Sequence, residues 1–171
     1  QVENEDLSTA TLYCNLEPCC HENKKTPPCT KAIIQSGIGK VVIANLDPNP
    51  EVAGKGLKKL EDAGIQTESG LCQDEGEKLN RIFFTYMRKG RPFIHLKVAQ
   101  TLDGRICDSK GSSKWISGVE ARKEVHQMRL IYDAVAVGSG TARSDDPSLT
   151  IRMGIENYGK VPYRIVFGSA S

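Results

Sequence analysis

The sequence has no long apolar run and no large excess of charge of one sign. No stretch approaches the roughly 18 consecutive apolar residues that a membrane helix needs, and no secretory signal pattern opens the chain. The formal net charge is +2, and aromatic residues make up only 6% of the chain. Nucleic-acid-binding surfaces are usually basic and often carry aromatic side chains. The composition therefore argues against nucleic acid or membrane as a partner, and favours a cytosolic protein with a small-molecule substrate.

The sequence also lacks an initiator methionine. It opens on Gln1 and passes from a polar segment straight into a strand-like run, so we expect it to be incomplete at its N-terminus. A content of 39% hydrophobic and 26% charged residues is ordinary for a globular chain and supplies material for a core. A length of 171 residues allows either one large domain or two small ones.

The spacing of apolar residues predicts alternating strands and helices. We expect strands at 11–16, 40–44, 65–68, 93–99, 133–137 and 164–167, and helices at 30–36, 55–63, 74–89 and 119–130. One face of the helix at 74–89 would be buried through Leu79, Ile82, Phe83, Tyr86 and Met87. Such alternation predicts α/β sheets with crossover connections. The helix-breaking Gly90-Arg91-Pro92 favours a domain boundary near residue 90, with a single continuous α/β domain as the alternative.

Three of the six cysteines, Cys19, Cys20 and Cys29, crowd into one polar, proline-rich loop. This clustering suits a metal site in a reducing compartment better than a set of disulfides. The pair Pro27-Pro28 places Cys29 at the start of the predicted helix, where the helix dipole would favour its thiolate form. Two such thiolates would make half of a zinc site. A structural zinc loop and unmetallated thiols are the alternatives.

No His-x-Glu motif occurs in the sequence. Zinc nucleobase deaminases carry one ahead of Pro-Cys-x-x-Cys, and its glutamate moves protons without binding the metal. His21 is followed directly by Glu22, and neither His95 nor His126 has a glutamate two residues on. We therefore expect the third metal ligand and the catalytic glutamate to lie upstream of this chain. His21 is too close to Cys19 for easy tetrahedral closure and is expected to be a solvated loop histidine.

The segment Gly138-Ser139-Gly140-Thr141 follows the predicted strand at 133–137 and suits close approach of the backbone to phosphates. The third glycine of a Rossmann fingerprint would fall at residue 143, which is Arg143. A conventional dinucleotide-binding fold is therefore disfavoured.

Several motifs together resemble the bifunctional deaminase/reductase family of riboflavin biosynthesis. In the first half they are Leu16-Glu17-Pro18-Cys19-Cys20-His21, Thr26-Pro27-Pro28-Cys29 and Asp47-Pro48-Asn49-Pro50. In the second half they are the segments 97–105, 113–117 and 140–152. The resemblance implies a cytidine-deaminase-like α/β/α zinc deaminase domain at 1–90, N-terminally truncated. A dihydrofolate-reductase-like α/β reductase domain, C-terminally truncated, would follow at 91–171.

The resemblance also implies site residues. Zinc would be bound by Cys19 and Cys29. The residues implied to face NADPH are Ala99, Trp115, Thr141, Asp145 and Ser169, and those implied to face the substrate are Ser113, Arg129, Leu149 and Arg152. Without the resemblance, Arg129 would be interpreted as a solvated charge and Trp115 as a core residue.

The reaction implied by the resemblance has two steps. The first is zinc-dependent hydrolytic deamination of a diaminopyrimidinone ribosyl 5-phosphate, and the second is NADPH-dependent reduction of the ribosyl chain to ribityl. A cytoplasmic homo-oligomer is expected. The alternatives are a protein with the reductase activity alone and a non-catalytic relative with a deaminase fold that stabilises a partner.

Overall fold

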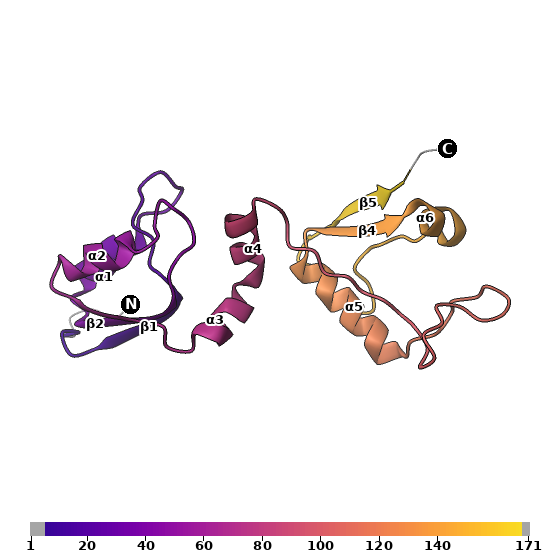
Figure 1. The fold of residues 1–171 in the computed structure, drawn as a ribbon, viewed down its shortest axis with the longest axis horizontal. Helices are drawn as coiled ribbons and strands as arrows, with labels where there is room; N and C mark the ends of the chain where they lie inside the picture. Colours follow the sequence, from indigo (N-terminus) through magenta and orange to yellow (C-terminus); the bar gives the residue numbers. More distant parts are fainter. Residues whose placement is uncertain (1–5, 169–171) are drawn as a thin grey trace. The chain divides into compact units, whose positions relative to one another are not determined.

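The computed structural model describes residues 6–168, and its backbone contacts divide the chain into two compact units, Gln1–His95 and Leu96–Ser171. Strands and helices alternate in both units, so the prediction of a mixed α/β fold is confirmed (Figure 1). Within residues 6–168 no helix is both long and apolar enough to cross a membrane.

The first unit is built on three parallel strands in the order β1-β2-β3. The elements follow the chain as β1 (Thr11–Leu16), α1 (Cys29–Ser36), β2 (Lys40–Asn45), α2 (Lys55–Glu61) and β3 (Gln66–Ser69). The pairing of Leu16 with Asn45 aligns the carboxyl ends of β1 and β2. Each crossover is a helix, as parallel strands require, and the predicted elements at 11–16, 30–36 and 40–44 are confirmed.

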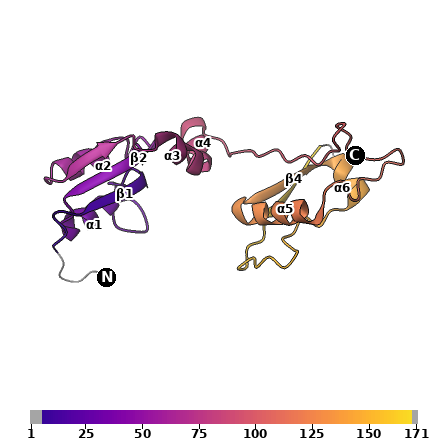
Figure 2. The same ribbon diagram turned by 90° about the horizontal axis from the view of Figure 1, so that it is seen from below.

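Helices α1 and α2 cover one face of this sheet (Figure 1), and Figure 2 shows the same sheet from below. The core consists of buried residues from both helices, from β2 and from the residue before β3: Ile33, Val41, Ile43, Leu60 and Ile65. Helix α1 ends at Gly37, whose positive φ of 72° permits the backbone N–H to bond to the carbonyl of Ile34. Burial of the apolar helix faces therefore fixes α1 and the loop before it against the sheet.

The single helix predicted at 74–89 is wrong, because two helices occupy this region. They are α3 (Gln73–Leu79) and α4 (Arg81–Lys89), and Asn80 between them has φ −95° and ψ 12°. The side-chain amide of Asn80 donates to the carbonyl oxygen of Gly76 at 3.0 Å, a local bond that competes with a continuous helix. The predicted buried face is also wrong, since Leu79 and Tyr86 are 68% and 61% exposed while Phe84 is buried.

The second unit contains α5 (Val119–Ile131), β4 (Ala134–Gly138), α6 (Ser139–Asp145) and β5 (Tyr163–Phe167). Strands β4 and β5 are parallel, and α6 contacts both of them. The strand predicted at 93–99 is wrong, because these residues form neither strand nor helix. Their apolar side chains, such as Leu96 at 82% exposure, have no neighbouring strand within the described residues to pack beside.

Candidate functional site

The two cysteines of the proline-rich loop are brought together at the carboxyl end of β1. Cys29 is the first residue of α1, and its backbone N–H donates to Cys19 Sγ at 3.3 Å. The backbone N–H of Thr30 donates to the carbonyl oxygen of Cys19 at 3.2 Å, so the loop folds back onto the start of the helix. In open parallel sheets, ligands bind beyond the carboxyl ends of the strands. The thiols therefore lie where a site in this fold is expected.

The charges around this pair favour one thiolate, at Cys19. Burial raises the pKa of Cys19, but hydrogen bonds from the Lys24 ammonium, 2.5 Å away, and from Cys29 outweigh that effect and leave its pKa lowered. The hydrogen bond that Cys29 makes to Cys19, together with burial and the adjacent negative charge, raises the pKa of Cys29. The prediction that the helix start favours the thiolate of Cys29 is therefore wrong, because its pKa is raised. The first thiolate to form opposes ionisation of the second.

Sequence reasoning missed the role of Glu17, which is buried at the end of β1. Its carboxylate accepts hydrogen bonds from four backbone N–H groups, those of Asp47, Gly54, Gly56 and Leu57, at 2.8–3.2 Å. Burying a carboxylate costs free energy unless hydrogen bonds compensate the lost contact with water. Here these hydrogen bonds also attach the end of β1 to the first turn of α2. The only signal in the sequence is a charged residue between Leu16 and Pro18.

Asp47 and His21 lie beside Glu17. Asp47 is buried, and its Oδ1 accepts the N–H of Asn49 at 2.8 Å. Burial raises the pKa of Asp47, and the nearby charge of Glu17 acts in the same direction, while the bond from Asn49 and the charge of His21 oppose it. The Nδ1 atom of His21 is buried without a hydrogen-bond partner, so this residue is not the solvated loop histidine that we expected.

The arrangement in the first unit fits half of a zinc site. Two thiols share one location, and an ammonium favours the ionised form of one of them, which is the form that binds metal. Within residues 6–168, no set of three histidine, cysteine or carboxylate side chains is arranged to hold a metal ion. Cys19 and Cys29 would supply two ligands of such a site, and His21 does not form a set of three with them.

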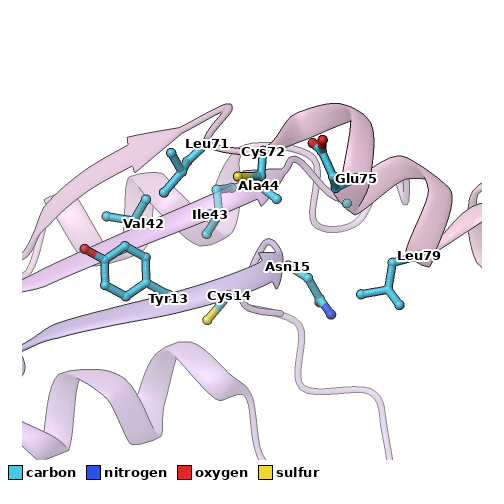
Figure 3. A pocket seen from close by; sticks show the side chains of 11 residues that line it. Tyr13, Cys14, Asn15, Val42, Ile43, Ala44, Leu71, Cys72, Glu75 and Leu79 are labelled. Carbon is cyan, nitrogen blue, oxygen red and sulfur yellow. The ribbon is translucent and has the colours of Figure 1, made fainter.

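A separate apolar pocket of about 320 Å³ lies beside α3. Figure 3 shows Tyr13 and Cys14 from β1 and Val42 from β2 on one side of it, with Glu75 and Leu79 of α3 on another. The lining includes neither Cys19 nor Cys29. This pocket is therefore not the metal site.

In the second unit, the structure brings together two of the residues implied to face the substrate, Arg129 and Arg152. Arg129 lies on α5, and its Nη1 donates to the carbonyl oxygen of Thr150 at 2.5 Å. Arg129 Nη1 and the backbone nitrogen of Arg152 lie 3.4 Å and 3.0 Å from the same atom, His126 Nδ1. Burial lowers the pKa of Arg129, and the charge of Arg152 lowers it further. Arg129 is therefore not simply a solvated charge. Leu149 is buried, while Ser113 is exposed in a separate loop.

The residues implied to face NADPH are spread over three segments. Thr141 and Asp145 lie four residues apart on α6 and so share one face of it. Trp115 is 70% exposed, with the Arg122 guanidinium 4.3 Å from the centre of its ring. Ala99 is half-buried, and Ser169 lies outside the described residues. Over residues 6–168, no hydrogen bond joins Ala99 or Trp115 to α6.

Residues 1–45 match the family described as the cytidine and deoxycytidylate deaminase zinc-binding region, and residues 92–171 match the RibD C-terminal domain. The riboflavin biosynthesis protein RibD of Aquifex aeolicus is 53% identical over 148 residues, which are 86% of this chain and 41% of that protein. The chain is similar to RibD proteins along most of its length. The RibD of Escherichia coli is 43% identical over 89% of the chain and 41% of that protein.

Solved structures show the same similarity. A diaminohydroxyphosphoribosylaminopyrimidine deaminase/5-amino-6-(5-phosphoribosylamino)uracil reductase from Thermotoga maritima is 49% identical, with a TM-score of 0.79 over 88% of this chain and 42% of that one. The RibD of Acinetobacter baumannii, form 1, also has a TM-score of 0.79, at 44% identity, and the match covers 88% of this chain and 43% of that one. The chain thus spans about two fifths of the length of the RibD proteins that it matches.

The two family matches, to residues 1–45 and to residues 92–171, leave out the partners of Glu17. Asp47, Gly54, Gly56 and Leu57 all lie between residue 45 and residue 92. Only the structure therefore connects this segment to the cysteine loop.

Proposed function

We propose that the protein carrying this chain acts in riboflavin biosynthesis as a zinc-dependent deaminase and an NADPH-dependent reductase. The deaminase would act on a diaminopyrimidinone ribosyl 5-phosphate, and the reductase would convert the ribosyl chain of the product to ribityl. The observation that carries the proposal is that Cys19 and Cys29 lie together at the carboxyl end of β1. The second unit follows in the chain and contains the pair Arg129 and Arg152. We also propose that the protein works in the cytosol as a homo-oligomer.

The deaminase is assigned to residues 1–90 and the reductase to residues 91–171. In the first domain Cys19 and Cys29 would bind zinc, and the bound zinc would activate water for attack on the pyrimidine. Lys24 would hold the Cys19 sulfur ionised before the metal binds. Glu17 would fix the strand end that carries the cysteine loop.

In the second domain, Arg129 and Arg152 would bind the 5-phosphate, because guanidinium groups match phosphate oxygens in charge and geometry. Ser113 and Leu149 are assigned to the same substrate. The residues assigned to NADPH are Ala99, Trp115, Thr141, Asp145 and Ser169. The protein's part in hydride transfer would be to orient the two reactants, since the cofactor supplies the hydride.

The two activities can be separated by substitution. Cys29→Ser should abolish deamination and leave the reduction of already deaminated substrate intact, because the thiolate ligand belongs to the first domain only. Arg152→Ala should raise the KM for the phosphorylated substrate of the reductase at least about tenfold and leave deamination unchanged. Separate assays of ammonia release and NADPH oxidation test both. Loss of both activities in the Cys29 variant, with its fold retained, would contradict the two-site assignment.

A further inference from the structure

His126 is buried on α5 and connects the two arginines of the second unit, although no motif drew attention to it. Its side chain is 7% exposed. The backbone N–H of Arg152 donates to His126 Nδ1 at 3.0 Å, and Arg129 Nη1 lies 3.4 Å from the same nitrogen. Arg129 in turn donates to the carbonyl oxygen of Thr150. The segment from Thr150 to Arg152 is therefore attached to α5 at two backbone atoms.

This attachment brings the backbone of Arg152 close to the Arg129 guanidinium, and neither arginine has an acidic partner in the described part of the chain. The Nε atom of Arg129 is buried without a hydrogen-bond partner. Two like charges held close repel each other, and a buried unpaired donor costs free energy. An anion between the two groups would remove both costs.

We propose that His126 is a positioning residue for the 5-phosphate of the substrate, and that it acts by holding Arg152 beside Arg129 through its bond to the Arg152 backbone. This inference rests on the proposed function, because it takes the two arginines as the phosphate-binding residues. His126 does not itself touch the phosphate. It sets the distance between the two groups that do.

The chemistry of the imidazole suits this role. To accept the Arg152 N–H, Nδ1 must carry no proton, so His126 is neutral with its proton on Nε2. Burial lowers the pKa of His126, the charges of Arg129 and Arg152 lower it further, and a hydrogen bond with the Thr150 backbone opposes them without reversing the shift. The lowered pKa favours the neutral ring near physiological pH. A third positive charge is thereby avoided beside the arginines.

Two variants and one control test the proposal in the protein that carries this chain. His126→Leu keeps the apolar volume and removes the acceptor, while His126→Asn keeps an acceptor oxygen near the position of Nδ1. Gln127→Leu is the control, since Gln127 is the exposed neighbour on the same helix. For each protein, the KM is measured for NADPH, for the ribosyl 5-phosphate substrate and for the same substrate without its phosphate.

We expect His126→Leu to raise the KM for the phosphorylated substrate about tenfold, the loss of roughly one well-placed hydrogen bond. The KM values for NADPH and for the dephosphorylated substrate should stay within about twofold, because the arginines contact neither. His126→Asn should recover most of the loss, and Gln127→Leu should behave as the unchanged protein. Equal losses for all three ligands, or no loss for the phosphorylated one, would overturn the proposal.

Two further measurements distinguish failure of the proposed function, or of the variant to fold, from failure of the positioning role. If the unchanged protein reduces no ribosyl 5-phosphate, the proposed function fails, and inorganic phosphate becomes the probe. A Kd for phosphate about tenfold higher in His126→Leu would still support the positioning role, and an unchanged Kd would overturn it. If the leucine variant does not fold, ¹⁵N NMR of the unchanged protein decides. A proton on Nε2 supports the proposal, and a proton on Nδ1 contradicts it.

Discussion

Glu17 and Asp47 show how single residues set the geometry around the cysteine pair. The Glu17 carboxylate accepts hydrogen bonds from four backbone N–H groups, which belong to the loop before α2 and to the first turn of α2. One of them belongs to Asp47, which follows β2 as Glu17 follows β1. Bonds to a charged acceptor are stronger than those between neutral groups. The end of β1, from which the cysteine loop begins, is therefore fixed by a residue that touches neither thiol.

Asp47 provides a prediction on pH. Because burial raises its pKa in the folded chain, the stabilisation linked to its protonation is complete below the ordinary carboxyl pKa and is lost as the pH rises through the raised value. We expect Asp47→Asn, which keeps the oxygen that accepts the Asn49 N–H, to raise the Tm near neutral pH and to leave it unchanged in acid. Thermal unfolding across the pH range checks this. The exposed Asp62→Asn serves as control, and a lower Tm at neutral pH for the Asp47 variant would contradict the account.

At the scale of elements, the sequence was sufficient to predict a strand or helix where a local pattern of residues determines it. The strand at 11–16 and the helix that ends before Gly37 follow from β-branched content and from a glycine with positive φ. The helix at 74–89 failed because periodicity does not reveal that the Asn80 side chain bonds to the backbone of Gly76. The strand at 93–99 failed because a strand needs a partner, and pairing is not a local property.

The first turn of α2 provides a prediction on packing. A Cβ atom at Gly56 would lie 2.2 Å from the carbonyl oxygen of Pro18 and 2.9 Å from Glu17 Oε1, so α2 can approach the cysteine loop only with glycine here. We expect Gly56→Ala to lower the free energy of unfolding by about 1–3 kcal/mol, the usual cost of overpacking. Chemical denaturation measures the change. Gly118→Ala, where the added atom meets open space, should change stability by less than about 0.5 kcal/mol, and equal effects would refute the close approach.

Across the whole molecule, the sequence predicts the candidate site of the first unit better than that of the second unit. Cys19 and Cys29 share one short loop, so their spacing alone predicted that they lie close together. In the structure the backbone N–H of Cys29 donates to Cys19 Sγ. The link between His126 and Arg152 spans 26 positions and passes through a backbone N–H, which no side-chain motif records. The sequence contains no His-x-Glu motif, and within residues 6–168 no group of three histidine, cysteine or carboxylate side chains is arranged to hold a metal ion.

The central claim is that Cys19 and Cys29 bind zinc, and the zinc content of the purified protein tests it most directly. We expect about one zinc ion per chain in the unchanged protein, and loss of that zinc in Cys19→Ser and in Cys29→Ser, because serine is a poor substitute for a thiolate ligand. Cys72→Ser, at an exposed cysteine outside the loop, should keep its zinc. Stoichiometric zinc in a protein with both Cys19 and Cys29 replaced by serine would contradict the account.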